Sequence, residues 1–216
     1  MRELLQRWRL RVIHAADLLR LRWVCWLHPG LEVDPAASSN LAVARYVLAP
    51  GARLRIGPGV VCERRPGALS FLLEAGAQVE VGRGTWLRSE LGPVTLAVFE
   101  GARLEIGSES FLNGCHVSAK KEVTLGHRAW VGPGSRIFDS DQHDFDADRP
   151  ERLDPVRVGD CVWIASDVTV LRGVTIGAHS VVGARSVVTR DVPPHTLAFG
   201  APATPRGKVG DRSTVR

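Results

Sequence analysis

Aliphatic residues recur at every sixth position through the C-terminal part of the chain. The clearest series is Val158, Ile164, Val170, Ile176, Val182 and Val188. Small residues follow four of these six directly, at Gly159, Ala165, Gly177 and Gly183. A period of six fits neither the 3.6 residues of a helical turn nor the alternation of a strand. It predicts short strands joined by corners, with three sides closing one coil and the aliphatic residue pointing inward.

A related signature continues toward the N-terminus. Leu125, Val131 and Ile137 keep the six-residue step, and three Gly-Ala segments starting at 51, 76 and 101 begin 25 residues apart. A coil of about eighteen residues plus a longer corner accounts for the longer unit. Because one coil alone is unstable, the coils must stack. We predict an all-β parallel β-helix, with less regular coils over 34–122 and regular coils over 123–192. A β-sandwich, or a separate small β domain in the N-terminal half, is the alternative.

Residues 1–27 have helical spacing instead. The apolar positions are Leu4, Leu5, Trp8, Val12, Ala15, Ala16, Leu19, Trp23, Trp26 and Leu27. His28-Pro29-Gly30 is a plausible stop, so we assign 1–33 to an amphipathic α-helix and its entry turn. Two roles remain open for this Arg- and Trp-rich helix. It can lie on an anionic membrane surface, or it can cap the open end of the solenoid or pack on a partner subunit.

The six-residue register of the regular coils breaks once, over residues 138–157. This polar stretch must leave the solenoid as a loop, and a loop on a rigid scaffold is where a site is expected. Its single histidine, His143, can act as a base if a carboxylate orients it. We take Asp141 as the candidate partner, although other aspartates are close enough in sequence, namely Asp139, Asp144 and Asp146. A solvated surface loop or a cation site would also fit this composition.

Charge and cysteine content narrow the function classes. Of the net charge of +5, residues 1–30 contribute six arginines and two acids, a balance of +4. Positive charge confined to one terminal segment does not favour nucleic-acid binding, which needs a basic folded face. The four cysteines form no CxxC pair, so neither a metal cluster nor a disulfide framework is expected. With no evident secretory signal and no bilayer-spanning run, we expect a cytoplasmic protein.

Residues 107–200 resemble the hexapeptide-repeat O-acetyltransferases, the family of galactoside, maltose and polysaccharide acetyltransferases. The resemblance covers a little under half of the chain. The matching segments are 123–126, the Asp/His loop, 158–166, 173–177, 182–194 and 200–202. It implies a left-handed β-helix, acetyl-CoA as the acyl donor, no required metal, and acetyl transfer to a hydroxyl or amino group of a sugar.

The resemblance also implies roles for individual residues. His143 stands where the family has the base that deprotonates the acceptor. Asn113, six residues after Gly107, stands where the family binds the acceptor or the oxyanion, although Asn-Gly is also a favoured turn pair. The family binds CoA between two subunits of a homotrimer. The implied CoA positions are Ala165, Ser166, Ala184, Thr189 and Arg190, with Arg206 and Lys208 in the tail 193–216, which is alternatively a solvated basic segment.

Two departures bear on the substrate. Ala165 replaces a glycine that is frequent in the family, and the N-terminal acceptor-binding helices of the small-sugar members are not recognisable. The second departure favours a polysaccharide or lipid-linked glycan acceptor, with a location in the cytoplasm or at the inner face of the membrane. A non-catalytic assembly platform is one alternative. A zinc carbonic anhydrase-like trimer is another, although its paired histidines are not matched by the scattered His116, His127 and His143.

Overall fold

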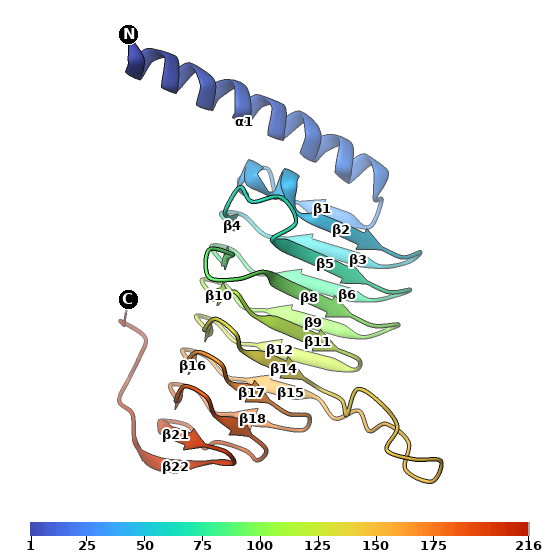
Figure 1. Cartoon of the computed structure of the whole chain (residues 1–216), viewed down its shortest axis with the longest axis vertical. Coiled ribbons are helices and arrows are strands. Elements are labelled where there is room, and N and C mark those ends of the chain that lie inside the picture. The colour runs from blue at the N-terminus through green and yellow to red at the C-terminus, as the bar shows by residue number, and fades with distance from the viewer. Residues whose placement is uncertain (216) are drawn as a thin grey trace.

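The structure is a stack of parallel coils with one long helix across its N-terminal end (Figure 1). This computed structural model describes residues 1–215. Residue 216, and the side chains of residues 2–5 with the predicted apolar positions Leu4 and Leu5, lie outside the described set. Each full coil adds one strand to each of three sheets. The predicted left-handed parallel β-helix with an N-terminal α-helix is confirmed.

The three sheets run the length of the solenoid, and the chain visits them in the order A, C, B. Sheet A contains β1 (Leu31–Val33), β3 (Arg53–Ile56), β6 (Gln78–Val81), β9 (Arg103–Ile106), β12 (Glu122–Leu125), β15 (Val156–Val158) and β18 (Thr175–Ile176). Sheet B contains β2 (Arg45–Leu48), β5 (Leu69–Leu73), β8 (Val94–Val98), β11 (His116–Ala119), β14 (Arg136–Phe138), β17 (Thr169–Val170) and β20 (Val187–Val188). Sheet C contains β4 (Val61–Cys62), β7 (Trp86–Arg88), β10 (Phe111–Asn113), β13 (Trp130–Val131), β16 (Trp163–Ile164), β19 (Val181–Val182), β21 (Thr196–Gly200) and β22 (Ala203–Lys208). We call the turn from C to B the C–B corner and the turn from B to A the B–A corner.

The six-residue series forms the core as three ladders of inward side chains. In sheet A, Ile56, Val81, Ile106, Leu125, Val158 and Ile176 are in register from one coil to the next. Sheets B and C carry equivalent ladders that include Ile137 and Val170, and Val131 and Ile164. These residues are almost completely buried. Each contributes about 1.5–3 kcal/mol by leaving water, so the repeated pattern itself stabilises the stack.

In sheet A, the glycine that follows each aliphatic position of the ladder is required by the distance between coils. A Cβ added at Gly107 would lie 2.4 Å from the carbonyl carbon of Gly126 in the next coil, and one at Gly177 would lie 2.3 Å from the nitrogen of Pro194. No side chain tolerates such contacts with backbone. The glycines therefore let successive corners between sheets A and C stack closely, which explains why a glycine follows every residue of this ladder.

The 25-residue unit differs from the regular coil at the C–B corner and in sheet B. Residues 63–68 and 89–93 lengthen that corner, and β5 and β8 have five residues each where β17 and β20 have two. The corner is held by Arg65, which donates to the carbonyl oxygens of Ser89 and Glu90, and by Glu63, which accepts from the backbone N–H of Ser89. The extra residues thus build the outside of the coil and leave the ladders unbroken.

The two ends of the solenoid are closed differently. At the N-terminal end, α1 (Arg2–Leu27) and the 3₁₀-helix η1 (Ser39–Val43) cover the first coil. At the other end, β21 continues sheet C and pairs antiparallel with β22. The segment 193–216, which we expected to be a tail, therefore contains two strands, because Leu197 and Ala198 extend the sheet C ladder below Val181 and Val182.

Candidate active site

The loop 138–157 leaves the solenoid at the B–A corner, between β14 and β15 (Figure 1). Its base is fixed by Asp139, which is fully buried. The Asp139 carboxylate accepts hydrogen bonds from the backbone N–H groups of Lys120, Lys121 and Glu122, each at 2.7 Å. Three donors satisfy a buried carboxylate well, so Asp139 anchors the loop to the preceding coil.

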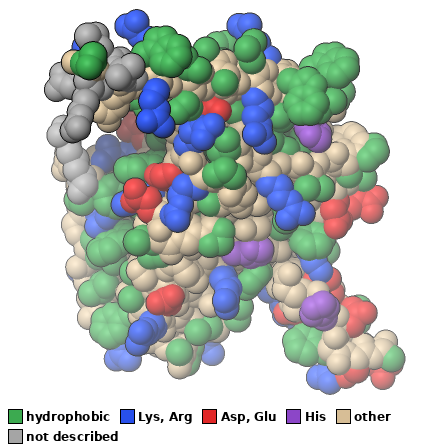
Figure 2. Space-filling view, turned by 45° about the horizontal axis from the view of Figure 1, so that its top comes forward, with side chains coloured by type: hydrophobic (Ala, Val, Ile, Leu, Met, Phe, Trp, Pro, Cys, Tyr) green, Lys and Arg blue, Asp and Glu red, His purple; other side chains and the backbone are tan. Residues whose placement is uncertain are grey.

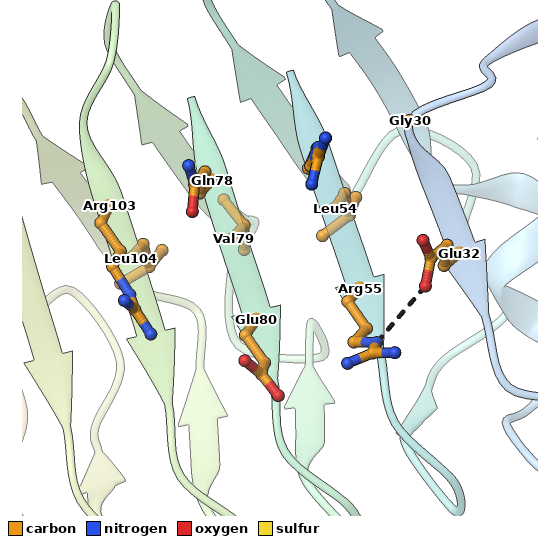
Figure 3. A pocket seen from close by; sticks show the side chains of 10 residues that line it. Gly30, Glu32, Leu54, Arg55, Gln78, Val79, Glu80, Arg103 and Leu104 are labelled. Atoms are coloured by element: carbon orange, nitrogen blue, oxygen red, sulfur yellow. Dashed lines mark ion pairs between the residues drawn. The ribbon is translucent and has the colours of Figure 1, made fainter. Parts of the chain in front are cut away.

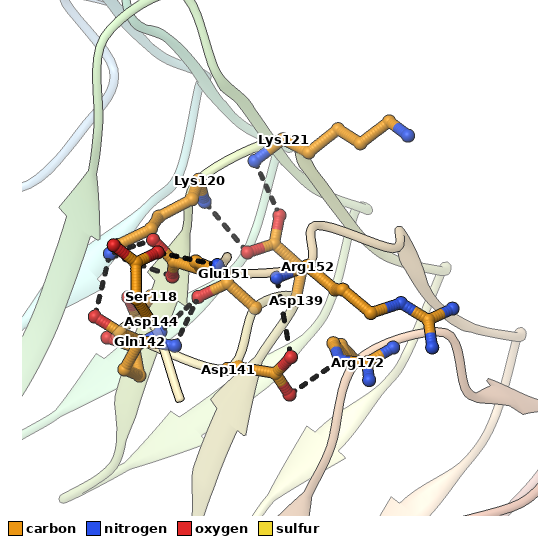
Figure 4. A network of polar contacts seen from close by, with 11 residues as sticks. Ser118, Lys120, Lys121, Asp139, Asp141, Gln142, Asp144, Glu151, Arg152 and Arg172 are labelled. Carbon is orange, nitrogen blue, oxygen red and sulfur yellow. Dashed lines mark hydrogen bonds and ion pairs between the residues drawn. The ribbon is translucent and has the colours of Figure 1, made fainter. Parts of the chain in front are cut away.

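A second anchor joins the two arms of the loop. The Lys120 ammonium lies 2.9 Å from both carboxylate oxygens of Glu151 and 3.1 Å from the carbonyl oxygen of Gln142 (Figure 4). Partial burial raises the pKa of Glu151, but hydrogen bonds from Lys120 and Ser140 outweigh it and leave the pKa below its ordinary value. Glu151 is therefore charged at neutral pH, and the ion pair holds both arms against the solenoid.

Asp141, the candidate partner of His143, faces the solenoid in this structure. Its carboxylate is 2.6 Å from Nε of Arg172, and the same guanidinium contacts Asp154 (Figure 4). The hydrogen bond from Arg172 lowers the pKa of Asp141. Among the described residues, no hydrogen bond or ion pair joins Asp141 to His143. Within a single chain, Asp141 therefore anchors the loop and does not orient the His143 imidazole.

His143 lies where the loop turns away from the solenoid. It follows Gln142, whose φ is 70°, and its side chain is exposed. The nearby carboxylates have other partners, since Asp144 accepts from the backbone N–H of Glu151 and Asp146 pairs with Arg149. The part of the chain that the structure describes gives the imidazole no hydrogen-bond partner. The imidazole ring is thus free to contact a molecule that binds beside the loop.

Asn113 ends β10 at the C–B corner and is 4% exposed. Its Oδ1 is the only buried side-chain nitrogen or oxygen within the described residues that has no hydrogen-bond partner. An unsatisfied buried acceptor costs about 1–3 kcal/mol, and such groups are uncommon in folded proteins. The alternative of a simple turn residue does not account for that atom, whereas a ligand donating to it would.

Sheet B separates Asn113 from His143. Asn113 precedes β11, whereas His143 follows β14, the parallel strand that pairs with β11. A strand of three or four residues spans about 10–13 Å. The two side chains therefore stand at opposite ends of sheet B in one chain.

The positions expected to bind CoA fall on the same two corners. Ala165, Ser166 and Ala184 follow strands β16 and β19 at the C–B corner, and Thr189 and Arg190 follow β20 at the B–A corner. The backbone of Ala165 is used within the stack, since its N–H donates to Val182 and its carbonyl oxygen accepts from Ser135. The side chains of Ala184, Thr189 and Arg190 are exposed. These positions line the outer edges of the coils.

A groove of about 360 Å³ connects the base of the loop with Thr189. Its lining comprises Phe138, Ser140, Asp141, Gln142, Leu171, Arg172 and Thr189. Arg206 and Lys208 lie on the exposed strand β22, and the guanidinium of Arg206 is 5.6 Å from the ring centroid of Phe199. The groove thus brings Asp141 and Thr189 together, while Arg206 and Lys208 stay on the last strand of the solenoid.

The C-terminal coils of the solenoid match known hexapeptide proteins. Residues 155–190 match the family model described as bacterial transferase hexapeptide (six repeats). The chain is 34% identical over 93 residues to the galactoside O-acetyltransferase of Escherichia coli, which is 42% of this chain and 46% of that protein. Residues 155–190 therefore carry a hexapeptide repeat, and the chain is similar to acetyltransferases of that kind.

Solved structures of two acetyltransferases are similar in fold to this chain. A galactoside acetyltransferase in complex with coenzyme A is 30% identical with a TM-score of 0.50, over 56% of this chain and 61% of that one. The polySia-specific acetyltransferase NeuO has a TM-score of 0.62 over 88% of this chain and 92% of that one. At 20% identity, the second likeness concerns the fold alone. The chain spans less than half of the length of the curated relatives it matches.

Several residues of the candidate site were absent from the expectations drawn from the sequence. Arg172, Lys120 and Glu151 position the loop, and each comes from a different segment of the chain. The one available signal was a charged residue at a corner of otherwise small residues, as at Arg172. Their partners lie 18 to 31 residues away, and only the register of the coils brings such residues together.

A second depression crosses the outer face of sheet A, on the coils that precede the loop (Figure 3). It has a volume of about 280 Å³ and is lined by alternating charges, including Glu32, Arg55, Glu80 and Arg103. Glu32 and Arg55 are 3.3 Å apart and largely exposed, so their ion pair contributes little. The lining contains no histidine, cysteine or serine, and its two carboxylates, Glu32 and Glu80, are exposed. Within the described residues, no three side chains converge as metal ligands.

Proposed function

We propose that this protein is an acetyl-CoA-dependent acetyltransferase that modifies a hydroxyl or amino group of a sugar. Similarity to hexapeptide acetyltransferases supports the reaction type, and one similar structure is a galactoside acetyltransferase in complex with coenzyme A. The observation that carries the proposal is the pair of unpartnered groups, the buried Asn113 Oδ1 and the exposed His143 imidazole, on the two corners that border sheet B.

Each residue has a defined task in this proposal. Acetyl-CoA supplies the acyl group as a thioester. A ring nitrogen of neutral His143 takes the proton of the acceptor hydroxyl as its oxygen bonds to the acyl carbon, and the thiolate that leaves recovers a proton. Oδ1 of Asn113 accepts a hydrogen bond from the acceptor and orients it. Asp139, Asp141 and Arg172 hold the loop and do not touch the reacting atoms.

The residues on the corners suit coenzyme A. The groove beside the loop combines Phe138 and Leu171 with polar Thr189, which fits an amphipathic pantetheine arm. Arg190, Arg206 and Lys208 are exposed cations that can contact phosphates. These residues fit the donor.

We further propose that the complete site forms between two copies of the chain in a homotrimer. In one chain, the two corners face away from each other across sheet B. Side-by-side packing of parallel solenoids around a threefold axis would bring the B–A corner of one copy next to the C–B corner of its neighbour. One site would then use the His143 of one subunit and the Asn113 of the other.

Mixed trimers test this arrangement. His143→Ala and Asn113→Ala chains, each inactive alone, are co-expressed with different tags and assayed for acetyl-CoA-dependent thiol release with a panel of sugars. Random assembly around a threefold axis restores about a quarter of the sites, because every mixed trimer contains one intact pair. No recovery in isolated mixed trimers would contradict the shared site. An active Asn113→Ala homotrimer would remove Asn113 from the site.

The acceptor and the location are part of the same proposal. We favour a polysaccharide or lipid-linked glycan over a free small sugar, because α1 and the long coils take the place of the acceptor-binding helices of small-sugar relatives. We favour the cytoplasm or the inner face of the membrane, supported by four unpaired cysteines in the described structure. The panel therefore includes nucleotide sugars, oligosaccharides and lipid-linked sugars. Wild-type protein that binds CoA yet releases no thiol with any of them would favour an assembly platform.

A further inference from the structure

Helix α1 uses one face to cap the solenoid. Leu21 is buried, and Val24 and Cys25 pack on the same core. Asp17 is 3% exposed and pairs with Arg64 through two contacts of 2.7 and 3.0 Å. His14 adds a hydrogen bond of 2.8 Å to Ser39. This face is therefore committed to the solenoid.

The opposite face carries a stripe of large apolar side chains, which we call the outer stripe. At about 100° of rotation per residue, its members point roughly 180° away from Leu21. Four are strongly exposed, at 64% for Trp8, 67% for Leu19, 59% for Trp23 and 76% for Trp26. The remaining members are Val12, Ala15 and Ala16. Such a continuous exposed apolar surface marks an interaction site.

Arginines border the outer stripe on both sides. By the same rotation, Arg9 and Arg20 lie along one edge, and Arg11 and Arg22 lie along the other. Asp17 is the sole acidic residue between positions 6 and 27, and it faces the solenoid. Figure 2 shows the hydrophobic and cationic side chains together over the helix. Over residues 6–27, the outward half of α1 is thus apolar and cationic, with no carboxylate.

This arrangement matches a helix that lies in a membrane interface. Tryptophan rings are favoured at the headgroup level, and arginine stems cover apolar surface while the charge reaches the phosphates. A protein helix is a poorer match, because paired helices carry charges of both signs at the edges of the seam and smaller residues within it. The uniform positive charge instead complements an anionic lipid surface.

The position of α1 allows this contact. The helix lies across the end of the coil stack, so its outer stripe faces away from the molecule (Figure 1). Within the described residues, no helix is long and apolar enough to cross a bilayer. A helix lying flat needs no such length.

We propose that the outer stripe of α1 binds the surface of an anionic phospholipid bilayer while the inner face keeps its contacts with the solenoid. Capping the solenoid and binding a membrane, which appeared as alternatives, are then the tasks of two faces of one helix. This inference is independent of the proposed acetyl transfer.

Vesicle flotation of the full chain tests the proposal. Phosphatidylcholine vesicles with about 30% phosphatidylglycerol should bind the protein at least about tenfold more strongly than pure phosphatidylcholine vesicles, and added salt should weaken this binding. The triple variant Trp8→Ser, Trp23→Ser, Trp26→Ser should lose at least about tenfold in affinity. Its matched control, Val47→Ser, Val61→Ser, Leu91→Ser, removes exposed apolar side chains from the solenoid and should bind as the wild type does.

The charge requirement has its own pair of variants. Arg9→Gln, Arg20→Gln should weaken binding by about tenfold or more, because each arginine near an anionic surface contributes severalfold. Arg53→Gln, Arg83→Gln removes two exposed arginines from the solenoid and should have no effect. Equal flotation of the wild type and the Trp-to-Ser variant would overturn the proposal.

Brominated lipids report on insertion directly. They should quench wild-type tryptophan fluorescence in the anionic vesicles. In Trp8→Phe, Trp23→Phe, Trp26→Phe, which keeps an aromatic stripe, binding should persist and quenching should disappear. Binding without quenching in the wild type would contradict insertion. A change of oligomeric state in the Trp-to-Ser variant, with no vesicle binding by the wild type, would show that a second copy covers the stripe.

Discussion

The coils before and after β12 place their additional residues at different corners. In the N-terminal coils, the extra length lies at the C–B corner over 63–68 and 89–93, where backbone and side-chain hydrogen bonds fold it onto the solenoid. In the C-terminal coils, the one long insertion lies at the B–A corner and carries His143 away from the surface. The interior ladders are the same in both. The scaffold thus tolerates insertions at its corners, and what they do depends on which corner they occupy and how they are anchored.

The largest expected effect is on activity: a substitution in the B–A insertion should lower kcat, whereas one in the C–B insertion should not. His143→Ala should lower kcat of thiol release by about 10²–10⁴, the usual contribution of a positioned general base. Leu91→Ala, at the lengthened C–B corner and 65% exposed, should leave kcat unchanged. CoA binding, measured by calorimetry, should be retained in both variants. Near-normal turnover by His143→Ala would remove this residue from the mechanism.

The next largest effect is on stability and concerns the buried ladders, which the N-terminal and C-terminal coils share. Leu87 in β7 and Ile164 in β16 occupy the same sheet C ladder, and both are completely buried. Replacing either with alanine should lower the free energy of unfolding by about 2–5 kcal/mol, because a cavity is left in a packed ladder. Chemical denaturation would measure both. If one variant lost less than about 1 kcal/mol, the two halves would not share an equivalent interior.

The ladders are also the part that could be predicted from the sequence. Stacking makes each inward position meet its equivalent one coil away, so the six-residue period fixes the fold without knowledge of distant contacts. The candidate site was harder to predict from the sequence. Asp141 is two residues from His143, which suggested a pair, but its partner Arg172 comes from the next coil. Asn113 was identified through resemblance. The lack of a hydrogen-bond partner for its Oδ1 could be recognised only from the folded structure.

The third effect tests the anchoring of the loop 138–157. Asp139→Asn replaces one acceptor oxygen of a buried carboxylate by a donor that faces the backbone N–H groups of residues 120–122. Loss of charged hydrogen bonds worth about 1.5–3 kcal/mol each should destabilise the protein and lower kcat by displacing the loop. Asp148→Asn, on the exposed tip of the same loop, is the control and should change neither. Thermal melting together with thiol release measures both. Unchanged values for Asp139→Asn would mean that the Lys120–Glu151 and Asp141–Arg172 pairs are enough to position the loop.

The smallest effect is the pH dependence of the ion pair between Asp141 and Arg172. The pKa of Asp141 is lowered in the folded state by the hydrogen bond from Arg172. The pair therefore stabilises the fold fully above the unfolded pKa of about 3.9, and this contribution is lost as the pH falls through the lower folded value. Arg172→Gln should melt below the wild type at pH 7, by an amount corresponding to about 1 kcal/mol. The difference should narrow below about pH 4 and vanish in stronger acid. For comparison, Arg65→Gln removes a guanidinium that binds carbonyl oxygens at the C–B corner, so its effect should not follow the titration of a carboxylate. If the difference in melting temperature between the wild type and Arg172→Gln stayed constant down to pH 2, the guanidinium would act by packing rather than by its charge.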